Sequence, residues 1–258
     1  MILQKLSMAL RRQDWFTVVL EILIVVIGIF LGLQANEWNE SRVERQLERT
    51  YLERIHADLL ADVEQREDST RLANRRMWQA SFLLDGIDDK DVASRRPVEF
   101  AEAIEKVSWR TGRMSSHNAY DELSGTGRTT LIRSIPLRNQ IAEYYATVEF
   151  WSGILDRSSL SREYSVASAG ILSMSHLAAI EASGPTPARP DFQIDSNEGV
   201  ALAEQLEARI DAVRLIPMLH KNHSTVTVAN AEVRALNDEL RSAIESYLGS
   251  RSVPERKE

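Results

Sequence analysis

The chain contains 258 residues, of which 43% are hydrophobic, and its formal net charge of -7 argues against a general nucleic-acid binder, which is normally basic. It contains no cysteine, so disulfides, thiolate metal sites and cysteine nucleophiles are excluded. The hydrophobic residues are unevenly distributed, because nearly every position from Trp15 to Leu33 is apolar. About 220 residues follow this segment, enough for one large domain with its own core.

Residues 15–35 are predicted to form a transmembrane helix. At a rise of about 1.5 Å per residue, the apolar run spans roughly 28 Å, close to the thickness of the hydrocarbon core of a bilayer. Glu21 is its one charge, and Trp38 just beyond it suits the membrane interface. A cleaved signal peptide is the alternative, because Leu33 and Ala35 suit a cleavage site. The apolar run exceeds the roughly 7–15 residues of a signal peptide core, which favours the membrane helix.

Charges beside the segment favour one orientation. Lys5, Arg11 and Arg12 precede it, and the first cation after it is Arg42. This favours a cytoplasmic N-terminus and an extracytoplasmic body. If Arg42, Arg45 and Arg49 are also counted, three cations lie on each side of the segment, and the opposite orientation stays open. Residues 1–14 are expected to lie on the inner surface, in contact with anionic lipid.

Small residues share one face of the predicted membrane helix with its single charge. At 100° per residue, the residues of this face fall within roughly 80° of each other: Glu21, Val25, Gly28, Gly32 and Ala35. Small residues let helices approach closely, and a carboxyl group in hydrocarbon is better tolerated against protein than against lipid. The pattern predicts an intramembrane interface with a helix of another protein or of a second copy. Alternatively, the glycines are ordinary for a membrane helix and Glu21 reaches the headgroups.

Residues 36–250 are predicted to form an all-α, antiparallel helical bundle, followed by a disordered tail at 251–258. One long helix should leave the membrane, with Leu52, Ile55, Leu59 and Val63 as its apolar stripe and a break near residues 68–70. Residues 86–97 are expected to form a loop, and Pro97 should open the next helix, which ends near Val107.

The second half of the bundle is also predicted to be helical. A short helix at 119–123 should stop at Gly125 and Gly127. Pro136 should begin a long helical stretch to Ala182, with weak points at Gly153 and Gly170, and residues 183–192 form a proline-rich connection. Residues 197–248 are interpreted as two helices joined near Pro217, the second with an apolar stripe of Leu236, Leu240, Ile244 and Leu248.

Two stretches carry a resemblance to a known family. Residues 20–40, LEILIVVIGIFLGLQANEWNE, resemble the hallmark of a family of uncharacterised bacterial single-span membrane proteins, in which a Glu-containing span ends in an Asn-Trp-Asn-Glu-like motif. Residues 118–145 are similar to that family's Tyr-x-Glu-Leu, glycine turn and Leu-Arg-x-x-Ile-x-x-Tyr-Tyr pattern. The resemblance covers about the first 150 residues. It implies the same topology and no reaction.

The candidate catalytic and metal motifs are sparse. Glu53 with His56, and His220 with His223, each have metal-ligand spacing, but a helical di-iron site needs more carboxylates and a two-histidine site lacks a third ligand. There is no nucleophile elbow or phosphate-binding loop in the sequence. We therefore expect no metal, no cofactor and no enzymatic activity.

Arginines accumulate between residues 108 and 141, where five of them oppose Asp121 and Glu122: Arg110, Arg113, Arg128, Arg133 and Arg138. Guanidinium groups bind carboxylates and phosphates bidentately, so this stretch is a candidate contact for an acidic partner or lipid headgroups. The alternative is pairing with acids on neighbouring helices. Trp78, Trp109 and Trp151 are expected in the core.

Two functions are compatible with these patterns. The leading hypothesis is a non-enzymatic, membrane-anchored interaction protein, an accessory or assembly subunit of a larger membrane complex. The alternative is an extracytoplasmic ligand-binding or sensing bundle that relays through a partner.

Overall fold

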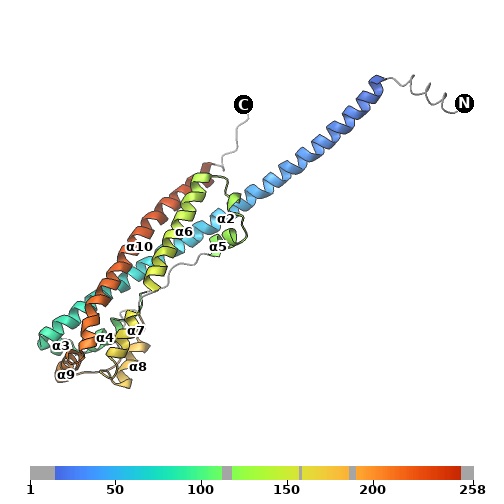
Figure 1. The fold of residues 1–258 in the computed structure, drawn as a ribbon. Helices are drawn as coiled ribbons and strands as arrows, with labels where there is room; N and C mark the ends of the chain where they lie inside the picture. Colours follow the sequence, from blue (N-terminus) through green and yellow to red (C-terminus); the bar gives the residue numbers. More distant parts are fainter. Residues whose placement is uncertain (1–14, 112–117, 157–158, 186–189, 251–258) are drawn as a thin grey trace. The chain divides into compact units, whose positions relative to one another are not determined.

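The computed structural model describes residues 15–111, 118–156, 159–185 and 190–250, and these residues form helices, turns and bends without any strand (Figure 1). The predicted all-α class is therefore confirmed for the described residues. The chain divides into two units, residues 1–52 and 53–258. The predicted interfacial segment at 1–14 and the predicted tail at 251–258 lie outside the described residues.

Helix α2 (Trp15–Asp88) contains 74 residues and passes through both units. Its N-terminal part makes it long and apolar enough to cross a membrane, by length and composition alone. The predicted break at residues 68–70 is wrong. Ser69 and Thr70 keep helical geometry, and their hydroxyl oxygens each accept a hydrogen bond of 3.1 Å from the Asn230 amide.

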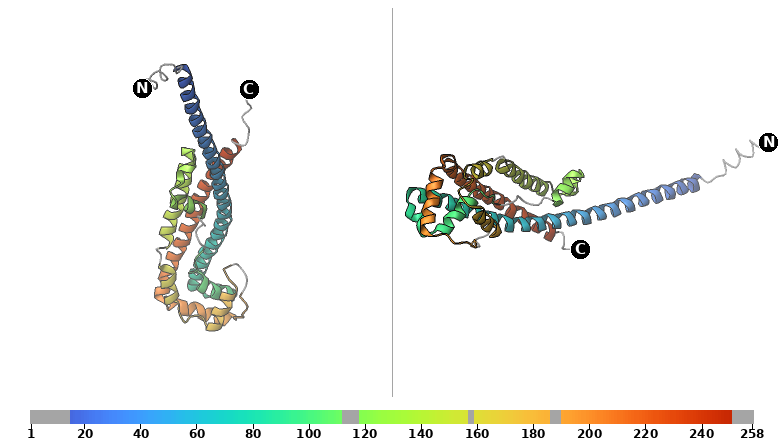
Figure 2. Two further views of the ribbon diagram at one scale, coloured as in Figure 1. Left: turned by 90° about the vertical axis from the view of Figure 1, so that its right-hand side faces the viewer. Right: turned by 90° about the horizontal axis from the view of Figure 1, so that it is seen from below.

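Three helices lie side by side along the second unit: α2, α6 (Ile135–Asp156) and α10 (Ile210–Ser250) (Figure 2). Helix α10 runs antiparallel to α2, since His56 contacts Glu245 and Arg66 contacts Asn230. Helix α6 also runs antiparallel to α10, and therefore in the same direction as α2 (Figure 1). Between α6 and α10 the chain forms three short helices, α7 (Leu160–Ala167), α8 (Met174–Ala182) and α9 (Ser196–Glu207).

The buried residues of these helices alternate at spacings of three and four. In α10 the seam consists of Ala212, Ile216, Leu219, His223, Val226, Asn230, Val233, Asn237, Leu240 and Ile244. In the second unit, buried residues of α2 follow the same spacing through Ile55, Leu59, Asp62 and Arg66. This is the heptad spacing of helices that pack at small crossing angles.

Both predicted apolar stripes differ from the residues that the structure buries along these helices. In α2 the buried position after Leu59 is Asp62, and Val63 is half-buried. In α10, Val233 and Asn237 are buried while Leu236 and Leu248 are half-buried. A stripe with spacing of four drifts around the helix, so apolar residues alone do not mark the contact line.

Short helices close one end of the bundle around an apolar core. They are α3 (Lys90–Arg95), α4 (Pro97–Lys106), α8 (Met174–Ala182) and α9 (Ser196–Glu207). Phe100, Ile180 and Leu206 are completely buried there. The predicted loop at 86–97 is wrong, because the Asp89 side chain accepts a 3.0 Å hydrogen bond from the Asp91 N–H and caps α3. Pro97 does begin α4, as predicted.

Helix α5 (Asn118–Gly125) ends as predicted, with Gly127 at a φ of 68°, and a 3-10 turn, η1 (Thr129–Leu131), follows. The predicted single stretch from 136 to 182 is wrong, since α6, α7 (Leu160–Ala167) and α8 are separate helices. Gly170 follows α7 at a φ of 83°, a conformation that favours glycine. The junction predicted at Pro217 lies instead at 208–209, between α9 and α10.

Candidate functional site

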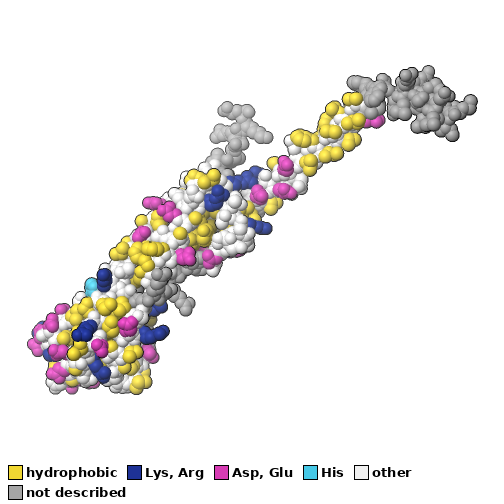
Figure 3. Space-filling model, in the orientation of Figure 1, with side chains coloured by type: hydrophobic (Ala, Val, Ile, Leu, Met, Phe, Trp, Pro, Cys, Tyr) yellow, Lys and Arg dark blue, Asp and Glu magenta, His cyan; other side chains and the backbone are white. Residues whose placement is uncertain are grey.

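The apolar part of α2 presents its side chains to its surroundings. From Val19 to Leu33 the described side chains are exposed, as are all five predicted interface residues: Glu21, Val25, Gly28, Gly32 and Ala35. Hydrophobic side chains cover this part of the helix in Figure 3. A Cβ atom added at Gly28 or Gly32 would meet nothing within 4 Å, so this face could accept a closely packed helix.

The arginine-rich stretch is divided between two places. Arg110 follows α4 at the closed end of the bundle, whereas Arg128, Arg133 and Arg138 lie around η1 and the start of α6, toward the other end (Figure 1). The Arg138 guanidinium donates a 3.4 Å hydrogen bond to the carbonyl of Ile132. Arg113 lies outside the described residues. The structure therefore does not bring the described members together as one anion-binding surface.

The histidines of the two candidate metal motifs bind different partners in the structure. His56 contacts the Glu245 carboxylate of α10 at 2.8 Å, and this contact lowers the pKa of Glu245. The buried His223 Nε2 donates a 2.8 Å hydrogen bond to the Val107 carbonyl. Burial lowers the pKa of His223, so its ring is neutral at pH 7. Among the described residues, no group of three or more His, Asp or Glu side chains could hold a metal ion.

The three tryptophans are less buried than predicted. Trp78 is 39% exposed and stacks on Phe82 with ring centroids 4.9 Å apart. Trp109 and Trp151 are half-buried. The prediction of a core position is thus wrong for Trp78, whose helix face carries Arg75 at 5.7 Å from its ring.

A buried polar cluster joins the three long helices near the middle of α6 and α10. The Arg66 guanidinium donates to the Asp62 carboxylate at 2.6 Å and to the Asn230 amide oxygen at 3.2 Å. The Tyr144 hydroxyl also donates to Asp62, and the Asn237 amide donates to the Tyr144 oxygen at 3.3 Å. Burial and the Asp62 charge raise the pKa of Tyr144. Within this cluster, the negative charge of Asp62 balances the positive charge of Arg66.

A second buried cluster contains more positive charge than negative charge. The Lys106 ammonium lies 3.2 Å from the Glu102 carboxylate and donates to the Gly184 carbonyl at 2.7 Å. Arg75 donates to the same carboxylate at 3.4 Å, and the completely enclosed Arg76 bonds to the Gln79 amide oxygen at 2.8 Å. Burial lowers the pKa of Arg76 to about 10, which leaves it protonated at pH 7.

Sequence reasoning missed both clusters. Asp62 and Arg66 of α2 occupy heptad positions of the seam, which the predicted apolar stripe does not include. In α10 the signal was a polar residue every seven positions, at His223, Asn230 and Asn237. Polar residues at such positions specify how helices align in coiled coils.

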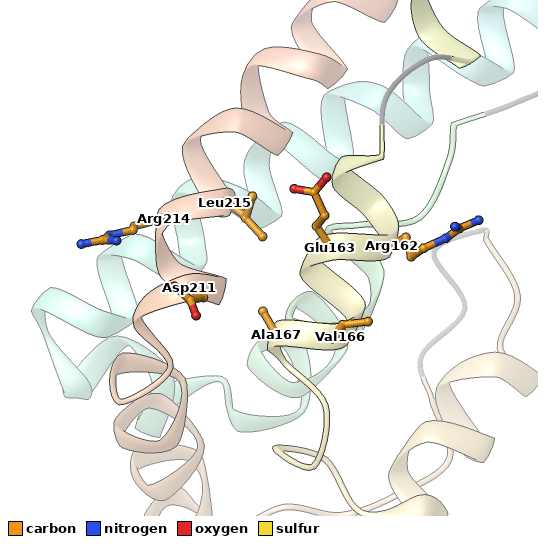
Figure 4. Close-up of a pocket in the computed structure, with 7 residues that line it drawn as sticks. All are labelled: Arg162, Glu163, Val166, Ala167, Asp211, Arg214 and Leu215. Atoms are coloured by element: carbon orange, nitrogen blue, oxygen red, sulfur yellow. The ribbon is translucent and has the colours of Figure 1, made fainter.

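A surface cleft of about 570 Å³ lies between α7 and the start of α10 (Figure 4), lined by Arg162, Glu163, Val166, Ala167, Asp211, Arg214 and Leu215. Glu163 and Leu215 approach the space between the helices, whereas Arg162 and Arg214 extend away from it in opposite directions. Its charged groups therefore do not converge on one point.

Comparisons with protein-family models, with curated proteins and with solved structures find no match to this chain. The family resemblance of residues 20–40 and 118–145 therefore remains a prediction.

Proposed function

We propose that the protein is a non-enzymatic, membrane-anchored interaction protein that serves as an accessory or assembly subunit of a membrane complex. The observation that carries this proposal is the continuity of α2, a single helix that contains both the exposed apolar segment and a seam of the bundle. The same helix thus supplies an apolar surface to the first unit and buried residues to the bundle of the second.

The partner that best fits the apolar segment is a transmembrane helix of another protein. Gly28 and Gly32 leave the backbone accessible, and Glu21 on the same face needs a polar group or close protein packing inside the bilayer. In this proposal the N-terminus is cytoplasmic and the bundle is periplasmic, in a bacterial inner membrane.

The proposal is tested by gentle detergent extraction of the C-terminally tagged chain, with the particle mass and its composition measured together. We expect a defined complex much heavier than the 29.2 kDa chain. Changing Gly28 and Gly32 to Leu should reduce recovery of the partner at least about tenfold, because the helices can no longer approach closely. Val19→Leu with Val26→Leu, on the opposite face, should retain it. A monomer or a pure homo-oligomer would contradict the accessory-subunit role.

A further inference from the structure

The cluster around Glu102 contains an excess of buried positive charge. Arg76 and Lys106 are at most 1% exposed, and Arg75 is about one third exposed. Among the described residues, Glu102 is the carboxylate that pairs with Arg75 and Lys106, and it acts on Arg76 only through its charge. The adjoining sequence adds no acid, since residues 107–120 and 182–190 contain neither Asp nor Glu. Buried charges normally have a partner of opposite sign.

Several N–H donors in this cluster have no acceptor among the described residues. The Arg76 Nε, Arg75 Nε and Gln79 Nε2 atoms are buried and make no hydrogen bond there. The one acceptor of the cluster that also makes no hydrogen bond, Glu102 Oε1, lies 3.2 Å from the Lys106 ammonium, so the unpaired donors outnumber it. Gln79 is 0% exposed, and its amide oxygen already accepts from Arg76. Buried polar groups are nearly always paired, so three unpaired donors from one helix face indicate a missing acceptor.

Lys106 is in the opposite condition, because its ammonium contacts are complete. It donates to the Ser183 hydroxyl at 2.8 Å and to the Gly184 carbonyl at 2.7 Å, and it pairs with Glu102. Trp109 lies beside both buried cations, 5.3 Å from the Lys106 ammonium and 5.8 Å from the Arg76 guanidinium. Lys106 therefore holds the segment after α8 in place, and the unpaired donors belong to α2.

The Asp62 cluster, about three turns earlier in α2, provides an internal comparison. There the Arg66 guanidinium has a carboxylate at 2.6 Å and an amide oxygen at 3.2 Å. Arg76 has an amide oxygen at 2.8 Å and the Pro185 carbonyl at 3.5 Å, and it pairs with no carboxylate in the described part of the chain. The same helix thus pairs one buried arginine with a carboxylate and leaves the other without one among the residues that the structure describes.

We propose that Arg75, Arg76 and Gln79 bind a small oxyanion, of the carboxylate or phosphate class, where α2, α4 and residues 183–185 meet. Guanidinium and amide N–H groups match the oxygens of such an anion, and a cation would be repelled by the surrounding charge. The partly exposed Arg75 marks the side from which the anion enters. This site belongs to residues 53–258 and does not depend on the proposed intramembrane interface.

The test is isothermal titration calorimetry on the full chain in detergent micelles, with sodium phosphate and sodium acetate as separate probes at constant ionic strength. We expect saturable binding near one anion per chain. At ten times the dissociation constant the melting temperature should rise by about 3–5 °C. Tighter binding of phosphate would identify a phosphate-class site, and tighter binding of acetate a carboxylate site. Both outcomes support the proposal.

Gln79→Glu is the decisive variant, because it places a carboxylate beside the unpaired donors. It should raise the melting temperature without added anion and weaken anion binding at least about tenfold. Gln205→Glu makes the same chemical change on the exposed face of α9 and should bind as the natural chain does. Arg76→Gln should also abolish binding. Absence of saturable binding to the natural chain, or undiminished binding to the folded Gln79→Glu variant, would overturn the proposal.

Discussion

Asp62 occupies a seam position at which a hydrophobic residue would be expected, and it is 3% exposed. Its carboxylate accepts hydrogen bonds from Arg66 and Tyr144, which come from two different helices. Such a pair adds little net stability over an apolar pair, but it is costly to break, because one charge then remains buried alone. It therefore favours a single alignment of α2 against α6 and α10.

Changing Asp62 to Asn should destabilise the bundle strongly. The Arg66 guanidinium would remain buried without its carboxylate, and we expect a loss of about 3 kcal/mol in the free energy of unfolding. Urea titration of the full chain, followed by circular dichroism, measures it. Asp68→Asn is the matched control, since Asp68 pairs with Arg71 on the exposed face of the same helix. Its effect should stay below about 0.5 kcal/mol, and equal effects of the two variants would refute the role of the buried pair.

His223 should make stability dependent on pH. Burial, Arg76 and His220 lower its pKa, while its hydrogen bond to Val107 partly opposes this. A pKa below the unfolded value of 6.5 means that the unfolded chain binds the proton more readily, so stability is full above pH 6.5 and falls as the pH decreases. His223→Gln keeps a donor for Val107 but does not titrate. Relative to this variant, the natural chain should lose up to about 1.4 kcal/mol per pH unit below 6.5. Parallel stability curves between pH 8 and 5 would contradict this.

The arrangement of the helices depends on the seam residues and on close contacts at the closed end of the bundle. Helix α9 begins with an N-cap, since the Asp195 side chain accepts a 2.8 Å hydrogen bond from the Glu198 N–H. Its contact with α3 depends on Gly199. A Cβ atom at this position would lie 2.7 Å from both the Ala93 carbonyl oxygen and the Pro97 Cβ.

Gly199→Ala should therefore destabilise the closed end of the bundle, although alanine favours helix formation. Ala93 presents backbone, which yields less than a flexible side chain, so we expect a loss of about 1–3 kcal/mol. Gly249→Ala in α10 is the control, because a Cβ atom there meets nothing within 4 Å. Thermal unfolding of both variants measures the difference. A Gly199→Ala variant at least as stable as the natural chain would show that α3 and α9 can separate without loss.

For the whole molecule, the charge bias around residues 15–35 predicts a periplasmic bundle. A C-terminal alkaline phosphatase fusion should be active, and a C-terminal green fluorescent protein fusion should remain dark. The uncleaved chain should also have an intact mass of 29.2 kDa, because an apolar run of this length favours retention over processing. Fluorescence of the green fluorescent protein fusion would indicate the opposite orientation. A mass lower by that of the first 35 residues would show that the segment is a cleaved signal peptide.

The element pattern followed from local signals. The long helix from the apolar segment, the start of α4 at Pro97 and the stop after α5 at Gly127 each depend on neighbouring residues, and the structure has all three. The wrong predictions concern helix ends whose sequence signals depend on tertiary packing. Pro217 predicts a junction between two helices, yet it lies inside α10. The backbone hydrogen bond that proline removes there is tolerated because the helix is packed along its seam.

The all-α class, the apolar N-terminal helix and several helix ends could be predicted from the sequence, because periodicity, capping and hydropathy act within a few residues. Only the packing of the helices shows that α2 and α6 run in the same direction, and that Asp62 pairs with Arg66 whereas Arg76 contacts no carboxylate of the described residues. It also placed Arg76 beside Pro185 and Lys106 beside Gly184, although these residues are far apart in the chain. Charge balance in a buried site is set by residues from several helices, and it becomes visible once those helices have packed.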